Sequence, residues 1–488
     1  MKLYKKSFIL TWILAIISLG SCKKYLEQVP DNRTEINSVE KVAQLLVNAY
    51  PNIDYLTFTE FSSDNVEDKG VGIGNSNDVI DRPYAWLDVV GSGSDRSTGY
   101  WNSCYESIAA ANQALEAIDK ENFGSAALPY KGEALVARAY SHFMLVMLFA
   151  TPYKIGGDNS APGIPYITSP ETKVIVPYTR GTVESTYAQI EKDLEDGIKL
   201  LSASAYKVPK FHFTPAAANA FASRFYLFKG AWKKVIAHST LTVPGNDFVN
   251  NMRLITTALK TLTVADFLTN FNGSSQKYNL LINSCYSTYF SIYAQPRHGY
   301  GPNIAKMFSL PNVTGKRLDN RILTFSSNDY TTYKFKNFFF NTGPGVGYNL
   351  MYSVLLTVDE SLMNRAEAYV EDGKFDLALK DMNDFMSVRI LGYNPATDGV
   401  TLAKIKSFYS IDDPKEGLIK TILEFKKAEF LQEGIRWFDI VRRNLTVKHN
   451  NFAPDGTETF AELKPGDPRR LFQLPLEAGL SSVPLNPR

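Results

Sequence analysis

The hydrophobic and polar positions of the chain follow a helical period over most of its length. Apolar residues recur at spacings of three and four, the pattern of a helix that buries one face. One such stretch follows Ser38, a residue type favoured at helix N-caps, and places Val42, Leu45, Leu46 and Tyr50 on one face. The longer stretches come in pairs and predict four helical hairpins, at about 97–152, 181–239, 354–391 and 415–445.

Two of the predicted hairpins share a detailed spacing around their turns. An aromatic residue near the end of the first helix is followed by a turn glycine, a second aromatic residue and an aliphatic residue at the same offsets. The two sets are Tyr226, Gly230, Trp232 and Val235, and Tyr369, Gly373, Phe375 and Ala378. This spacing resembles the tetratricopeptide repeat. We therefore expect a mostly α-helical fold, in which tetratricopeptide-like hairpins form a right-handed scaffold.

Two parts of the chain break the helical period. The stretch from Asp54 to about Thr98 is rich in Gly, Asn, Asp and Ser, which predicts a long loop, and long loops inside compact domains are usually functional. Residues of about 240–352 combine many aromatic residues with frequent Gly, Pro and Asn. We interpret this segment as an irregular, loop-rich subdomain with short strands that binds the ligand.

The N-terminus has the pattern of an export signal. Lys2, Lys5 and Lys6 precede an apolar run that starts at Phe8 and is too short for a comfortable membrane-spanning helix. Leu19, Gly20 and Ser21 stand directly before Cys22, which resembles a bacterial lipobox. We therefore predict a signal peptide at 1–21, a lipidated Cys22 and a tether at 22–34. The alternative is an ordinary secretory signal in which Cys22 is incidental.

Composition restricts the function further. The 488 residues are 44% hydrophobic, and no second apolar stretch approaches membrane-spanning length. Lys and Arg number 52 against 50 Asp and Glu, a net charge of +2 that would not attract nucleic acid. Cys104 and Cys285 allow a disulfide in an exported protein, but their apolar surroundings are equally suited to buried thiols.

Catalytic motifs are missing from the sequence. No two of the five histidines have metal-ligand spacing, and no nucleophile elbow, zinc-protease motif or phosphate loop occurs. Neighbouring carboxylates such as Asp64 and Asp68, or Asp193 and Asp196, leave a glycan hydrolase open. The excess of aromatic residues near Asp, Asn and Arg favours a saccharide binder, or a peptide binder, without a metal or other cofactor.

Several motifs together resemble the SusD/RagB family, the surface nutrient-binding lipoproteins of Bacteroidota. They are CKKYLEQVP after the lipobox, WNSCYESIAAANQAL, KGEALVARAYSHFMLV, RGTVESTYAQIEKDLEDGIKLL, LDNRI, NRAEAY, EFLQEGIRWFDIVRRN and LFQLPLEAGLSSVPLNPR. Two departures are the lysines after Cys22, where the family more often has an acidic residue, and the missing isoleucine in LPLEAGL. The resemblance implies one SusD-like domain at 35–488.

The resemblance also implies a function. Such a protein is lipid-anchored in the outer membrane, faces the cell exterior, and presents a captured oligosaccharide to a SusC-like TonB-dependent transporter without cleaving it. A peptide receptor of the RagB kind is the alternative within the family, and a lipid-anchored glycan hydrolase is the alternative outside it. Charged residues of the late motif have helical spacing, so we expect them to pair on one helical side as scaffold: Glu429, Glu433, Arg436, Asp439 and Arg442.

Ligand-binding residues are predicted from their position in the chain, because no motif carries them over from the family. The loop after the first helix and the irregular segment commonly meet on one face in such proteins. The candidates from the loop are Asp64, Asp68, Asn75 and Trp86, and those from the irregular segment are Tyr289, Tyr293, Arg297 and Tyr300. Instead of binding ligand, Trp86 could belong to the scaffold, and the tyrosines could pack in the core.

Overall fold

Helices dominate the part of the chain that the computed structural model describes, which is residues 35–89, 91, 93–173, 175–289, 296–320, 322–326, 329–332 and 334–488. The helices are α3 (Val39–Leu46), α4 (Leu56–Ser62), α5 (Asp78–Tyr84), α6 (Ser97–Glu121), α7 (Leu128–Phe149), α8 (Val183–Ile198), α9 (Pro215–Lys229), α10 (Trp232–Thr240), α11 (Val264–Asn270), α13 (Pro302–Ser309), α14 (Val358–Glu371), α15 (Phe375–Ser387), α16 (Pro395–Asp398), α17 (Leu402–Tyr409), α18 (Pro414–Glu429) and α19 (Ile435–Arg442). The strands are β1 (Glu67–Asp68), β2 (Asn279–Tyr286), β3 (His298–Gly299), β4 (Ile322–Ser326), β5 (Asp329–Thr332), β6 (Asn337–Gly343), β7 (Val346–Thr357), β8 (Val447–Phe452) and β9 (Glu458–Leu463).

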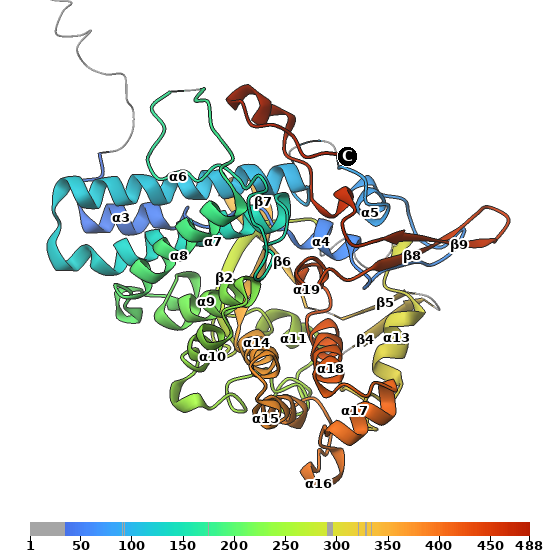
Figure 1. Ribbon diagram of the computed structural model, residues 1–488. Helices are drawn as coiled ribbons and strands as arrows, with labels where there is room; N and C mark the ends of the chain where they lie inside the picture. The colour runs from blue at the N-terminus through green and yellow to red at the C-terminus, as the bar shows by residue number, and fades with distance from the viewer. Residues whose placement is uncertain are drawn as a thin grey trace, which may run out of the picture. The chain divides into compact units, whose positions relative to one another are not determined.

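The helical hairpins pack against one another along the chain (Figure 1). Helix α7 packs between α6 and α8, α10 packs on α9 and α14, and α14 also contacts α15 and α18. The ring of Phe143 on α7 lies 5.6 Å from Phe221 and 5.2 Å from Phe228, both on α9. Aromatic side chains thus fill the space between hairpins. The prediction of a mostly helical, tetratricopeptide-like fold is confirmed.

Local residues explain where these helices begin and end. Ser38 is the N-cap of α3, as predicted, and its hydroxyl oxygen accepts the backbone N–H of Lys41 at 3.3 Å. Gly230 and Gly373, the two predicted turn glycines, both have φ of +73°. That left-handed conformation suits glycine, which has no Cβ to clash. Each glycine therefore allows the chain to leave one helix and start the next within three residues.

The predicted loop from Asp54 to Thr98 contains more structure than its composition suggested. It holds helices α4 and α5 and the two-residue strand β1. All seven residues of α4 are buried, so the helix has no polar face and no periodic signal. Helix α5 is equally short and contains Pro83, which is unfavourable inside longer helices. The loop prediction was wrong for these two segments because a helix of two turns is too short to show a helical period in the sequence.

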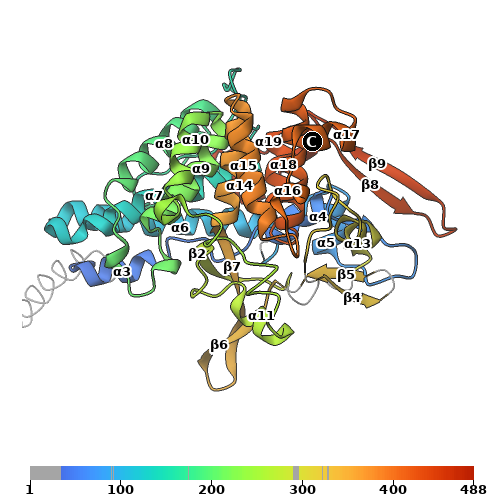
Figure 2. The same ribbon diagram turned by 90° about the horizontal axis from the view of Figure 1, so that it is seen from below.

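The irregular insert is built around a three-stranded antiparallel sheet in the order β2, β7, β6. Strand β7 runs for 12 residues and leads directly into α14, so the third predicted hairpin begins at Val358 and not at 354. In Figure 2, the paired helices lie above β2 and β7, whereas β6 and α11 lie below them. The insert thus has one longer strand beside the predicted short ones.

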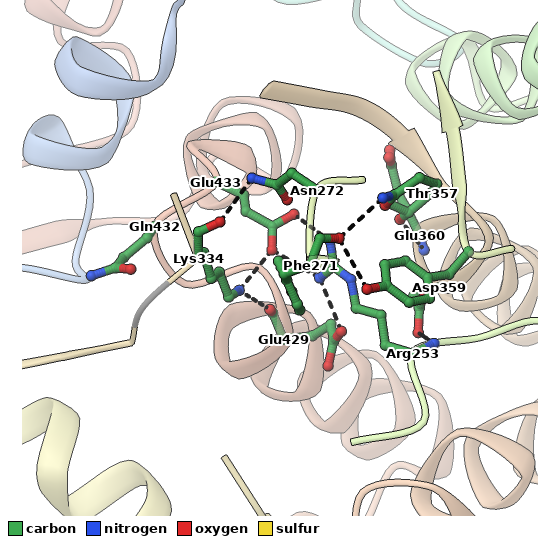
Figure 3. Close-up of polar contacts among 12 residues, drawn as sticks. Arg253, Phe271, Asn272, Lys334, Thr357, Asp359, Glu360, Glu429, Gln432 and Glu433 are labelled. Atoms are coloured by element: carbon green, nitrogen blue, oxygen red, sulfur yellow. Dashed lines mark hydrogen bonds and ion pairs between the residues drawn. The ribbon is translucent and has the colours of Figure 1, made fainter. Parts of the chain in front are cut away.

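A buried cluster of charged side chains joins the insert to the helical hairpins (Figure 3). Arg253 and Lys334 belong to the insert, whereas Glu429 ends α18 and Glu433 lies in the following turn. Arg253 Nη1 donates to Glu433 at 2.8 Å and to Glu429 at 3.1 Å, and Lys334 Nζ donates to Glu433 at 2.6 Å. Because all four side chains are withdrawn from water, each charge depends on its partners.

Helix α14 and the segment after α15 complete this cluster. The backbone N–H of Arg253 donates to Asp359 of α14 at 3.1 Å, and Arg389 Nε donates to Glu429 at 2.7 Å. Burial opposes the ionisation of Glu429, but the guanidinium groups of Arg389 and Arg253 prevail and lower its pKa to about 2. Glu429 is therefore held as a carboxylate that ties three segments together.

The late charged motif has a structural role, but not through one helical side as expected. Helix α18 ends at Glu429, and Gly434 has φ of +71° before α19 begins, so the motif spans two helices. Arg442 and Asp439 pair with each other at 2.7 Å, whereas Arg436 reaches Asp64 at 2.7 Å. The predicted mutual pairing was thus wrong for most of the motif. A turn at Gly434 redirects the side chains toward other segments.

Cys104 and Cys285 are both buried and free. The structure therefore decides between the two alternatives that the sequence left open for these thiols.

Candidate ligand-binding site

The two segments from which site residues were predicted lie against each other. Strand β1 pairs with β3, so that Asp68 stands opposite His298. The backbone N–H of Arg297 donates to the carbonyl oxygen of Asn75 at 3.0 Å. The loop after the first helix and the irregular insert thus meet, and Asp68, Asn75 and Arg297 come together.

Asp68 and Arg297 form a fixed ion pair at this junction. Arg297 donates to the two carboxylate oxygens of Asp68 at 2.8 and 2.7 Å, and the backbone N–H of Phe452 donates to Asp68 at 2.8 Å. Burial raises the pKa of Asp68, but these donors and the N–H of Gly70 outweigh it and the pKa is lowered. Arg297 also donates to the carbonyl oxygen of Phe452 at 2.7 Å. The pair therefore fastens the β8–β9 hairpin to the junction.

An open cleft of about 850 Å³ lies beside this junction. Four segments line it: the residues after α4, helix α13, the end of α18 and the β8–β9 hairpin. The lining residues are Asp64, Asn65, Val66, Glu67, Asn303, Ile304, Met307, Lys427, Lys448, Asn450, Glu458 and Phe460. We call this the polar cleft.

Among the predicted site residues that the structure describes, Asp64 alone lines the polar cleft. Arg436 donates to its carboxylate at 2.7 and 2.9 Å, and Lys427 donates at 3.0 Å. Burial opposes ionisation, but Lys427 and Arg436 hold the pKa of Asp64 far below its usual range. Asp64 is therefore a permanent carboxylate whose charge is already balanced by the scaffold.

The polar cleft combines one aromatic ring with several amide and carboxylate groups. Phe460 is 56% exposed, and Lys448 Nζ lies 4.3 Å from the centroid of its ring. Glu67 accepts the backbone N–H of Asn303 at 2.8 Å, and burial, with a smaller contribution from Glu458, raises the pKa of Glu67. An apolar ring beside hydrogen-bonding groups can hold the apolar face and the hydroxyl groups of a sugar.

Asn65 adds a polar group whose oxygen has no protein partner. Its amide nitrogen donates to Glu60 at 2.9 Å, but within the described part of the chain its buried Oδ1 accepts no hydrogen bond. Burying such an acceptor without a donor is unfavourable. A donor from a bound molecule or water would relieve that cost.

Tyr289 and Tyr300 do not form an exposed aromatic platform. Both side chains are at most 1% exposed, and their hydroxyl groups hydrogen-bond to each other. They belong to the core around Phe61 and Met351, and Tyr300 also donates to Glu60 at 3.2 Å. Neither ring offers a face to a ligand, so the expected stacking role is corrected to core packing. Tyr293 lies outside the described residues.

Trp86 and Asn75 differ in what they expose. The indole of Trp86 is 6% exposed, stacks on His449 with ring centroids 4.6 Å apart, and donates from Nε1 to Ser62 at 3.0 Å. Trp86 therefore has the scaffold role that was its alternative. Asn75 is exposed, and its contribution to ligand binding stays a prediction.

Sequence reasoning missed the β8–β9 hairpin, which supplies Lys448, Asn450, Glu458 and Phe460 to the polar cleft. A signal was present: Asp455 and Gly456 stand between two stretches that now pair from Val447 to Leu463, and Asp-Gly is a strong hairpin turn sequence. Gly456 has φ of +84°, as such turns require.

The fold and site define a class: a tetratricopeptide-like helical protein with an open, partly aromatic cleft and no group of metal ligands among the described residues. Residues 24–227 match the model of a SusD-like family described as starch-binding and associating with the outer membrane. Together with the comparisons below, this match shows that the chain is similar to proteins of the SusD-like family.

Individual relatives agree with this similarity. A SusD-like protein of Formosa agariphila is 23% identical, over 89% of this chain and 91% of that protein. A SusD superfamily protein of Bacteroides vulgatus superposes with a TM-score of 0.67 at 17% identity, over 93% of this chain and 99% of that one. A SusD-like carbohydrate-binding protein of the same species superposes with a TM-score of 0.64 at 17% identity, over 91% and 97%. No described helix is long and apolar enough to cross a membrane.

Proposed function

We propose that this protein captures an oligosaccharide at the cell surface, in the polar cleft. The observation that carries the proposal is the exposed ring of Phe460 in a cleft whose lining also includes amides, carboxylates and lysines. The family description as starch-binding and the carbohydrate-binding relative support this ligand class. A sugar ring would pack one face on Phe460, and its hydroxyl groups would donate to Glu67.

The scaffold around the polar cleft prepares it for binding. Arg436 and Lys427 hold Asp64, while Arg297 holds Asp68 and the β8–β9 hairpin. Binding groups that are held in place before the ligand arrives lose less conformational entropy on association. The cleft can thus bind a flexible oligosaccharide without first ordering its own walls.

The anchor and the partner complete the proposal. The lipobox-like residues before Cys22 support a lipid anchor, because acyl chains bury enough apolar surface for stable membrane attachment. Resemblance to the SusD/RagB family supports delivery to a SusC-like TonB-dependent transporter in the outer membrane. Cys22 lies outside the described residues, so the anchor rests on the sequence pattern.

Affinity electrophoresis of the full-length chain in detergent tests glycan capture. Gels would contain soluble starch, pullulan, xylan, laminarin or pectin, and retention on any of them supports glycan binding. We expect Phe460→Ala to lose about tenfold or more in affinity, since an aromatic contact and its buried area disappear. Phe408→Ala is the matched control, because Phe408 is also about half exposed, at 51%, but lies on α17.

The outcomes separate the alternatives. Equal retention of the Phe460 and Phe408 variants would remove the polar cleft from consideration. Retention by none of the five polysaccharides, together with binding to an immobilised peptide library, would favour the RagB-like alternative. Release of new reducing ends that Glu67→Gln abolishes would favour the hydrolase, since Glu67 and Glu458 are two carboxyl groups in one cleft.

A further inference from the structure

A second, larger cleft opens at an aromatic face of the insert sheet, which we call its aromatic floor. Tyr286 and Phe340 of this face line the cleft itself. Strand register places Phe338 and Phe340 of β6, Tyr348 and Tyr352 of β7, and Tyr286 of β2 on one face of the insert sheet, because alternate residues of a strand share a face. In the register, Phe340 stands opposite Tyr348, and Phe338 and Tyr286 both stand opposite Leu350. Five aromatic side chains therefore lie together on one face of the sheet. In most sheets, other elements would cover so apolar a face.

The rings of this floor touch one another but are not covered. The centroids of Phe338 and Tyr352 are 4.5 Å apart, those of Tyr286 and Tyr348 are 5.5 Å apart, and Phe211 adds a sixth ring 5.5 Å from Tyr352. Phe340 is 54% exposed and Tyr348 is 52% exposed. Large contiguous apolar surfaces of this kind usually mark an interaction site.

Polar groups border this floor. The cleft has about 1390 Å³ of open space, and its opposite wall comes from the end of α3 and from α6, with Asn48, Asn52 and Glu106 among its lining. Within the described residues, no hydrogen bond engages the hydroxyl groups of Tyr286 or Tyr348, so both are available to a ligand. Aromatic faces below and amide, carboxylate and hydroxyl groups at the side match the two kinds of surface of a sugar.

The floor is held in place from below. Asn272 Nδ2 donates to the backbone oxygens of Lys334 at 2.8 Å and Tyr352 at 3.1 Å. Lys334 belongs to the buried charge cluster that ties the insert to the helical hairpins (Figure 3). The Tyr352 end of the aromatic face is therefore tied to the helical scaffold although the face is open to solvent.

We propose that this aromatic cleft is a second carbohydrate-binding site, which holds an extended glycan by the apolar faces of its sugar rings. The proposal goes beyond the proposed function, because the aromatic cleft and the polar cleft share no lining residue. A protein partner is the less suitable occupant. The core of a protein–protein interface is depleted in charged groups, whereas the carboxylate of Glu106 is part of the lining of this cleft.

The aromatic cleft is open, and this indicates which part of a glycan it would bind. Several rings follow one another across three strands, which are spaced about 4.8 Å apart in a sheet. Such a row offers successive contacts to successive sugars and no closed end to a chain terminus. The ligand class is therefore an internal segment of an extended oligosaccharide or polysaccharide, and affinity should rise with chain length.

Neighbouring residues of one strand provide the test. Phe340 and Phe339 are similarly exposed, at 54% and 52%, but Phe339 points to the other face of the sheet and does not line the cleft. Full-length protein in detergent would be run through the same five polysaccharide gels as wild type, Phe340→Ala with Tyr348→Ala, Phe339→Ala, and Phe460→Ala. Melting temperatures of all variants would be measured alongside.

Each result decides the proposal. We expect the Phe340 and Tyr348 double variant to lose about tenfold or more in retention, while Phe339→Ala stays at wild type and all variants melt alike. Residual retention of Phe460→Ala would then come from the aromatic cleft. Full retention by the double variant overturns the second site, and loss only in Phe460→Ala would leave the polar cleft as the binding site. Retention of the wild type by none of the gels overturns both sites.

Discussion

Arg253 lies at the centre of the buried charge cluster, so its removal should strongly destabilise the fold. Its guanidinium is buried and donates to Glu433 at 2.8 and 3.0 Å and to Glu429 at 3.1 Å. Arg253→Met keeps the apolar stem but leaves two buried carboxylates with fewer cations. Breaking a buried ion pair from one side typically costs about 3–5 kcal/mol. We expect a loss of that size in the free energy of unfolding.

Urea unfolding followed by circular dichroism measures the change, with the midpoint compared at equal slope. Lys192→Met is the matched control, because it also removes a cation from a carboxylate, Asp196 at 3.0 Å, but on an exposed helix surface. Such a surface pair is worth about 0.3–0.5 kcal/mol. Arg253→Lys should fall between the two, since it keeps the charge and loses the bidentate geometry.

Acid dependence gives an independent check on the same cluster. The pKa of Glu429 is about 2 in the folded protein, below its ordinary value of 4.5, so Glu429 stabilises the fold above about 4.5 and loses this contribution as the pH falls toward 2. Arg253→Met removes one of the cations that lower this pKa, so the stability of the variant should depend less steeply on pH in that window.

The urea experiment can refute the reasoning. If Arg253→Met loses less than about 1 kcal/mol of unfolding free energy, and no more than Lys192→Met, the cluster does not anchor the insert.

Three further predictions concern the turns, the core and the anchor. Gly230→Val should lower the free energy of unfolding by more than about 1 kcal/mol, and by more than Gly373→Val does. Both glycines have φ of +73°, but only at Gly230 would an added Cβ meet Ile155, at 2.6 Å. Equal losses of the two variants in urea unfolding would contradict this prediction. Tyr289→Ala should lower the free energy of unfolding by about 3–5 kcal/mol, as truncation of a large core side chain does. A melting temperature equal to that of wild type would contradict a core position for Tyr289. Cys22→Ala should leave a folded chain in the soluble fraction after a high-salt wash, and its persistence in the membrane pellet would exclude lipid at Cys22 as the anchor.

Local features of the sequence were sufficient for the helical scaffold. The N-cap at Ser38 and the turn glycines Gly230 and Gly373 act through their own backbone and their nearest neighbours along the chain. Helical periodicity is likewise a short-range property, so the paired helices could be predicted without knowing what they pack against. The meeting of the segments around Asp68 and Arg297 was also expected, although from the family resemblance and not from the residues.

Tertiary structure alone decided which side chains are buried and which face a cleft. Tyr289 and Phe340 are both aromatic residues of the insert, yet the first is fully buried and the second is 54% exposed, because the sheet turns one face to α4 and leaves the other open. The sequence determined that the chain would build stacked helical hairpins, and its N-terminal pattern predicts a signal of lipoprotein type. Pairing of β8 with β9 and of β6 with β7, and hence both clefts, depends on contacts between distant residues whose register and burial no local pattern specifies.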